Sequence, residues 1–271
     1  TTTGASNTSI GYASLGANTT ADNNVAVGYN ALTLNVTGTK HTAVGAGALA
    51  ANTATEDNTA VGYEALNDNT SGTQNTAVGG FSLCKQTTGS WNTAIGYGSL
   101  DSQTTAAGST AVGGNALTAN TTGSENTAVG YQSLDANTTG GQNVAVGAAS
   151  LSANTTGSKN VAMGNASLDA NTTGTDNTAI GYGTLGLNTT GTQMVAIGYN
   201  VLAANTTAIF NVGIGNVALQ ANTTGANNVA LGAAALASNT TAANNTGLGH
   251  LALYANTTGT RNTAVGSLTL D

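Results

Sequence analysis

The sequence contains little of the material from which active sites are built. Its 271 residues include no proline, one cysteine, two histidines and four lysine or arginine residues, and only 6% are charged. Average chains are about a quarter charged, so clustered acids, bases and metal ligands are scarce here and we expect no enzyme. The single cysteine, Cys84, excludes an intrachain disulfide; this count fits any compartment and suits an extracellular protein that needs no such crosslink.

Positive charge and long apolar runs are also missing. The eleven Asp and Glu residues give a net charge of −7, which argues against nucleic acid and anionic membrane surfaces as partners. No apolar run approaches the ~20 residues of a membrane span, so we predict no membrane insertion. The first residues, Thr1 to Gly4, are neither a starting Met nor a signal peptide, and we expect a processed chain or an excised segment.

A strict repeat is what the sequence has instead. A glycine recurs every seventeen residues from Gly11 to Gly266, giving sixteen copies with no insertion or deletion. A leucine follows each glycine by four residues, from Leu15 to Leu270, and an aliphatic residue or Met precedes it. The unit reads N-T-A-V-G-Y-x-A-L-x-A-N-T-T-G-x-x, as in residues 126–142. Equal repeat lengths indicate a chain that winds into identical coils.

Each unit predicts one short strand and one corner. Residues 127–130 alternate with a period of two, which is typical of a strand. We expect residues 131–136 to be extended or irregular, and residues 137–140 (N-T-T-G) carry the chemistry of a turn. Val129 and Leu134 are the large apolar residues that we place in a thin core.

The sequence therefore predicts an all-β fold, a parallel β-solenoid or β-roll of sixteen 17-residue coils, forming a single repeat domain over residues 1–271 with no caps. Such a thin core needs help from backbone ladders and from packing against neighbouring chains. Stacked coils place identical residues above one another. We therefore expect hydrogen-bonded asparagine ladders in two columns, Asn126, Asn143, Asn160 and Asn177 and then Asn137, Asn154, Asn171 and Asn188.

The N-T-A-V-G-Y-x-A-L and N-V-A-V-G blocks (the latter Asn143 to Gly147) resemble the S-V-A-I-G-x-x-A repeats of trimeric autotransporter adhesin heads. Similar units occur in phage tail-fibre and other surface repeat proteins. The resemblance covers essentially the whole chain, although the repeat is longer here through the added Leu and N-T-T-G segment. It implies left-handed parallel β-rolls that associate as trimers and present adhesive surfaces, outside the cell or on a cell or virion surface.

Residues with chemical potential are isolated. The sequence has no G-x-x-x-x-G-K-[ST] phosphate loop and no G-G-x-G-x-D calcium repeat, and Asp176 is typical of a solvated position. Cys84 and His250 fall ten coils apart, roughly 45 Å at ~4.8 Å per coil. They cannot meet within one chain, and we assign no catalytic, cofactor-binding or metal-binding residue.

Three surface features each leave two interpretations open. The regular pattern is broken at Phe81, Cys84, Lys85 and Trp91. These residues reflect either neutral sequence drift in variable columns or a local contact site. N-x-S/T sequons recur from Asn18 to Asn256; they either carry glycans or are explained by turn and ladder hydrogen bonding alone. An aromatic column lines one edge and either binds sugars or a partner chain or caps the core: Tyr12, Tyr29, Tyr63, Tyr97, Tyr131, Tyr182 and Tyr199.

These features favour a structural subunit or rod segment of an extracellular fibre or filament, with an adhesive role as well. Its expected partners are copies of itself, packed laterally or head to tail, and a surface glycan or host-surface ligand. The phase of Thr1 and Asp271 fits head-to-tail stacking, and a segment of a longer rod almost equally well.

The alternative function is an ice-binding β-solenoid. It requires flat T-x-T columns, whereas Thr138 and Thr139 are adjacent and point in different directions. The other threonine column, that of Thr127, is Val in six of sixteen copies, and we expect it to face inward.

Overall fold

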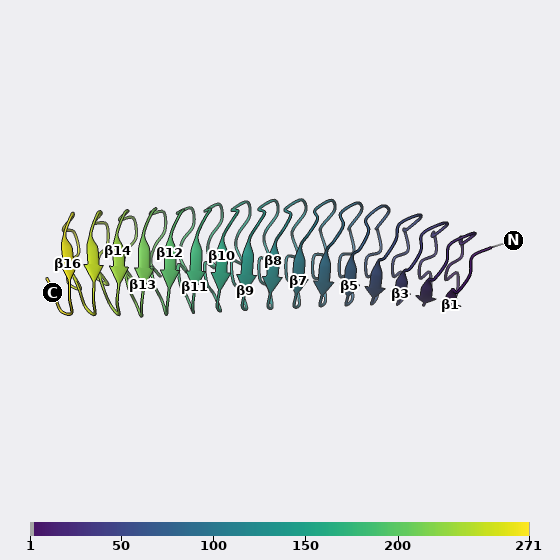
Figure 1. Cartoon of the computed structure of the whole chain (residues 1–271), viewed down its shortest axis with the longest axis horizontal. Helices are drawn as coiled ribbons and strands as arrows, with labels where there is room; N and C mark the ends of the chain where they lie inside the picture. The colour runs from purple at the N-terminus through teal and green to yellow at the C-terminus, as the bar shows by residue number, and fades with distance from the viewer. Residues whose placement is uncertain (1–2, 271) are drawn as a thin grey trace. The chain divides into compact units, whose positions relative to one another are not determined.

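A computed structural model describes residues 3–270, so the expectation for Thr1 and Asp271 concerns residues outside the described range. The chain forms two compact units, which meet in sequence at Thr139 and Gly140, and each is described by itself. Both consist of successive coils that carry one three-residue strand each (Figure 1).

The first unit contains β1 (Thr8–Ile10), β2 (Val25–Val27), β3 (Thr42–Val44), β4 (Thr59–Val61), β5 (Thr76–Val78), β6 (Thr93–Ile95), β7 (Thr110–Val112) and β8 (Thr127–Val129). The second contains β9 (Val144–Val146), β10 (Val161–Met163), β11 (Thr178–Ile180), β12 (Val195–Ile197), β13 (Val212–Ile214), β14 (Val229–Leu231), β15 (Thr246–Leu248) and β16 (Thr263–Val265).

Within each unit, every strand pairs in parallel with the strand of the next coil. Ala43 lies opposite Ala60 in the first unit, and Ala162 lies opposite Ala179 in the second. Each pair is separated by one repeat length, so like residues stack. The expected all-β parallel solenoid is confirmed, and the described residues contain no helix.

The middle residue of each strand, not its flanking aliphatic residue, faces the interior. Ala128 is fully buried, whereas Thr127 and Val129 on either side are half-buried and face outward. The expectation that Val129 lies in the core is therefore wrong. Leu134 is fully buried, as expected. The coil is so narrow that opposite its leucine it accommodates a methyl group but no larger side chain.

Three backbone positions with positive φ shape the turn that follows each strand, as at Gly130, Gln132 and Leu134. Gly130 has a φ of 136°, and at the equivalent Gly113 an added Cβ would lie 2.5 Å from the carbonyl oxygen of Gly130 in the next coil. Leu134 has a φ of 52°, a backbone conformation that residues other than glycine rarely adopt. Its equivalents share this φ because each leucine amide donates to the next coil, as Leu117 N does to Ser133 O at 3.0 Å.

The asparagines form two buried ladders, as expected. In the strand-side ladder, the Asn column that precedes the strands, Oδ1 of Asn58 accepts from the backbone N of Asn75 at 2.9 Å. In the corner ladder, the Asn column of the N-T-T-G turn, Nδ2 of Asn171 donates to Oδ1 of Asn154 at 2.9 Å. Gly72 links the two ladders because its carbonyl oxygen accepts from both Asn58 and Asn69, each at 2.9 Å.

We predict that Leu134→Ala lowers the free energy of unfolding by about 2–5 kcal/mol, as truncations of buried leucine do. Asp135→Ala, one position further along, is the matched control and should change it by no more than about 0.5 kcal/mol. Denaturant unfolding of both variants checks this. Equal effects would contradict the placement of Leu134 inside the coil.

Candidate functional site

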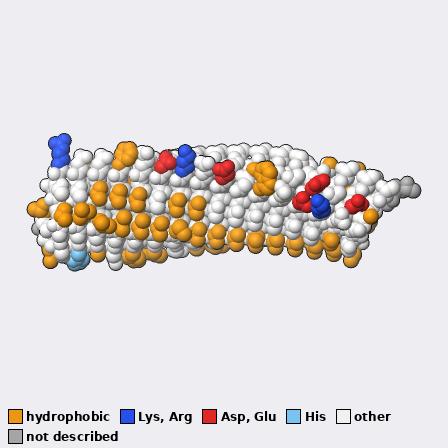
Figure 2. Space-filling model, viewed as in Figure 1, with side chains coloured by type: hydrophobic (Ala, Val, Ile, Leu, Met, Phe, Trp, Pro, Cys, Tyr) orange, Lys and Arg blue, Asp and Glu red, His pale blue; other side chains and the backbone are white. Residues whose placement is uncertain are grey.

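The outward surface of the strands is the most regular feature of the exterior. We call the first and third residues of each strand the sheet face of that unit. These residues are Thr, Val, Ile, Leu or Met in every strand, so the sheet face carries no charge. Hydrophobic side chains form a row along it, while charged side chains lie beside the strands (Figure 2).

This arrangement corrects the expectation that the Thr127 column faces inward. Thr127 and Val129 project from the same side of β8, and Ala128 projects from the other. Some members of the third-residue column are more than a third exposed, including Met163 at 40% and Leu231 at 48%. An uncharged apolar surface of this kind typically marks an interaction site.

The tyrosine column forms a second exposed feature, which we call the tyrosine edge. Its seven tyrosines are each more than half exposed, from 51% at Tyr199 to 75% at Tyr12. Tyr182 and Tyr199 stack with ring centroids 5.6 Å apart. Tyr12 and Tyr29 stack in the same way, at 5.5 Å. The tyrosines leave much of their surface in solvent, an arrangement that favours binding over capping of the core.

The four irregular residues do not form one patch. Phe81 packs edge-on between Tyr63 and Tyr97, at centroid distances of 5.2 and 5.8 Å, and so continues the tyrosine edge. Trp91 lies in a different column, where its indole Nε1 donates to Gln74. Lys85 pairs with Asp101 at 3.8 Å.

The residues that carry potential chemistry stay apart. Burial, aided by nearby Asp101, raises the pKa of the Cys84 thiol to about 11, so it remains protonated and weakly nucleophilic at neutral pH. His250 belongs to the other unit. Over residues 3–270, no group of three or more His, Cys, Asp and Glu side chains is placed to hold a metal ion. Nor does this range contain a helix long and apolar enough to cross a membrane.

The corner asparagines that form the sequons use their side chains inside the coil. Asn35, Asn69 and Asn120 are fully buried, and the Nδ2 atom that a glycan would modify donates within the structure. The folded chain therefore does not present these three amides to a glycosylating enzyme. Hydrogen bonding within the corner ladder explains why asparagine occupies these three positions.

His41 replaces an asparagine in the strand-side ladder, which the sequence analysis did not single out. It is buried, its Nδ1 accepts from the backbone N of Asn58 at 3.2 Å, and its Nε2 lies 2.9 Å from Thr55 O. Neutral imidazole protonated on Nε2 satisfies both contacts, but it cannot also accept from Asn52 Nδ2, which lies 3.0 Å from the same nitrogen. Burial lowers the pKa of His41 below its ordinary 6.5, and the bond to Thr55 O and the charges of Asp57 and Glu56 oppose this only in part.

Gln86 interrupts the corner ladder in the first unit. It is fully buried, and its Nε2 atom has no hydrogen-bond partner among the described residues. Gln103, one coil further, is also buried, but its Nε2 donates to Gln86 Oε1 and to Ala106 O, both at 3.1 Å. Gln86 therefore leaves one buried donor unpaired, whereas Gln103, with the same side chain, does not.

Comparisons with known proteins do not extend this picture: no protein-family model matches the chain, and no curated protein matches it.

We predict that His41→Asn makes stability less dependent on pH. The native state binds fewer protons than the unfolded chain, so the contribution of His41 is complete above pH 6.5 and declines as the pH falls below it. Urea unfolding at pH 7 and pH 5.5 should show a smaller loss in the variant than in the wild type. His250→Asn, at an exposed position, is the control. If His41→Asn lost as much stability between pH 7 and pH 5.5 as the wild type does, the prediction would be wrong.

We also predict that Gln86→Asn stabilises the fold by about 1 kcal/mol, because it restores the ladder residue and removes an unpaired buried donor. Gln103→Asn serves as the control and should bring no gain, since its amide is already bonded. Thermal unfolding of both variants tests the difference. A destabilised Gln86→Asn would show that the unpaired donor is not what limits stability there.

Proposed function

We propose that this protein is a structural subunit or rod segment of an extracellular fibre or filament, which associates with copies of itself through its sheet faces and has an adhesive role as well. The parallel β-solenoid is consistent with a structural role. The observation that carries the finer proposal is the sheet face, which keeps an aliphatic residue or Met in the third position of every strand.

The physical case for lateral association is the absence of charge from this surface. Outward positions of a solvated sheet usually alternate with polar residues, whereas here Val129 and its equivalents are retained as far as Leu248 and Val265. Exposed apolar side chains gain from leaving water. Threonine methyl groups and aliphatic side chains pack against a like surface without leaving a charge unpaired.

Head-to-tail stacking is the second mode of assembly that we propose. A parallel ladder leaves unpaired N–H and C=O groups at both ends, and a second copy would extend the 17-residue register. Extracellular or surface localisation and an adhesin-like or tail-fibre-like role are part of the same proposal. Their support is the resemblance of the N-T-A-V-G repeats.

We predict that lysine on the sheet face abolishes lateral association. Val112→Lys with Ile197→Lys places one charge on each unit, and each charge must lose its water if copies pack there. The control, Thr105→Lys with Thr190→Lys, adds the same charge at exposed corner positions. Sedimentation velocity should give laterally packed oligomers for the wild type and the control, and for the sheet-face variant only monomers or single-width head-to-tail chains.

A wild type that stays monomeric at high concentration would overturn the lateral mode of assembly. Electron micrographs of the sheet-face variant test the head-to-tail mode separately, because single-width filaments would persist if the ladder alone joins the copies.

Ice binding is the second candidate function, and the orientation of the sheet face favours it more than the sequence did. In the first unit, Thr is the first residue of every strand except β2, and it projects outward in a regular T-x-V or T-x-I array. Thermal hysteresis measured on the purified protein decides between the two. Marked hysteresis in a monomeric wild type would assign the sheet face to ice, and its absence would leave self-association as the role.

A further inference from the structure

Cavities recur along one strip of the coils, between the tyrosine edge and the residues that follow the buried leucine. A cavity of about 550 Å³ in the second unit is bordered by Tyr182, Tyr199, Asp169 and Gln220. A cavity of about 560 Å³ continues from Gln220 to Tyr254. The two cavities share Gln220 as a lining residue and follow one another along the coils of β10 to β15, over roughly 24 Å at ~4.8 Å per coil. We call this hollowed strip of surface the groove.

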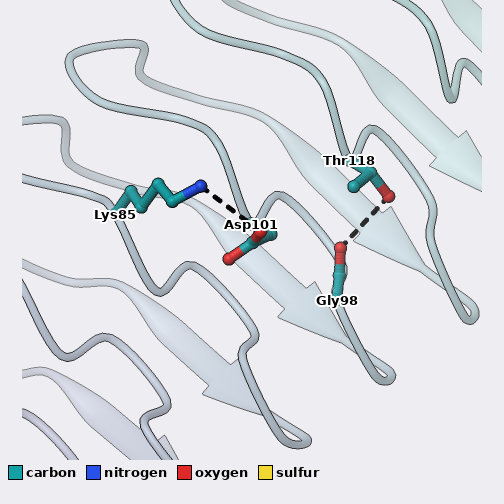
Figure 3. A network of polar contacts seen from close by, with 4 residues as sticks. All are labelled: Lys85, Gly98, Asp101 and Thr118. Atoms are coloured by element: carbon teal, nitrogen blue, oxygen red, sulfur yellow. Dashed lines mark hydrogen bonds and ion pairs between the residues drawn. The ribbon is translucent and has the colours of Figure 1, made fainter.

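Small residues create the hollow. Gly186 and Ala203 occupy the position after the buried leucine in two successive coils and border the first cavity. In the first unit, the same position holds Asp101 and Thr118. Asp101 pairs there with Lys85, and Thr118 Oγ1 donates to Gly98 O at 3.2 Å, so their side chains cover this strip (Figure 3). The groove thus depends on the small residues that this variable column carries in these coils.

The groove walls combine aromatic rings with uncharged polar groups. Tyr182, Tyr199 and Tyr254 are 54%, 51% and 42% exposed and offer ring surface. Asn200 and Gln220 supply amides that both donate and accept hydrogen bonds. Asp169 is the one charged residue that borders the two cavities within the described part of the chain.

This chemistry selects among possible ligands. The apolar face of a sugar ring stacks on an aromatic ring, and its hydroxyls pair with amides and a carboxylate; aromatic walls with a few placed polar groups are typical of ligand sites. Acidic polymers would meet Asp169 with no cation to offset it. The backbone groups beside the groove already bond between coils, as Leu202 N does to Ala218 O at 3.0 Å, so a peptide could not add as a strand.

We propose that this groove binds a neutral linear glycan, with its sugar rings against Tyr182 and Tyr199 and its hydroxyls on Asp169, Asn200 and Gln220. The groove lies in a different segment of the coil from the sheet face. The inference therefore deepens the adhesive role proposed above without requiring self-association. Tyr29 and Tyr63 flank a smaller cavity of about 210 Å³ on the same strip of the first unit.

The test is isothermal titration of the full chain with four neutral hexasaccharides, namely cellohexaose, chitohexaose, maltohexaose and mannohexaose. Heparin and poly-L-proline represent acidic and peptide ligands. Two groove variants are compared with the wild type: Tyr182→Ala with Tyr199→Ala, and Ala203→Gln, which fills the floor with a residue that the same column carries at Gln220. Tyr131→Ala is the matched control, because Tyr131 is equally exposed at 59% but borders none of these cavities.

We expect at least one hexasaccharide to bind, both groove variants to weaken it by about tenfold or more, and Tyr131→Ala to retain it. Circular dichroism verifies that the variants keep their fold. No binding of any hexasaccharide, equal binding by the groove variants, or preference for heparin or poly-L-proline would overturn the proposal. Measuring the sheet-face lysine variant as well separates the two ideas, since it should bind the glycan even if it no longer self-associates.

Discussion

Hydrogen bonds from the two buried asparagine columns are the interaction on which the rest of the structure depends. At each corner the backbone turns its polar groups inward, where no water competes, and these groups need partners. Asn69 accepts from Gly72 N and donates to Gly72 O, while Asn58 reaches the same carbonyl from the strand side. Adding or deleting one residue in the coil would move the side-chain amides of Asn58 and Asn69 away from the carbonyl of Gly72. The constant repeat length of seventeen follows from that geometry.

The sequence was sufficient to predict which residues stack, but not which of them face inward. A period of two separates Thr127 and Val129 from Ala128 without saying which side is the interior, and hydrophobicity favours the wrong answer. The deciding factor is the width of the coil, which Leu134 already fills. The left-handed φ of Leu134 was equally inaccessible, because sequence signals associate that conformation with glycine. The turn needs the conformation and the interior needs the side chain, so leucine bears the strain.

Departures from the consensus show how strongly each part of the coil constrains its residues. The ladders tolerate His41 only as a neutral ring, and they tolerate Gln86 with one donor unpaired. On the exterior, the column after the buried leucine varies freely, from Asp101 to Gly186 and Tyr254. The groove for which we propose a glycan could not be predicted from sequence, because it is the space that small residues leave empty across several coils. Only the aromatic column that borders it was visible as a pattern.

Because every coil rises by one strand spacing, a surface column presents its residues at multiples of that spacing, and the column's composition decides what it binds. A column whose residue type hardly changes from coil to coil, such as the third strand position, offers the same surface in every coil. It suits a partner with the same spacing, above all another copy of the chain. A column that changes from coil to coil offers a local site, and there a ligand is selected by a few side chains such as Tyr182 and Asn200. The assembly and the glycan binding that we propose therefore draw on different columns of one repeat, so each can be altered by substitutions that do not touch the other column.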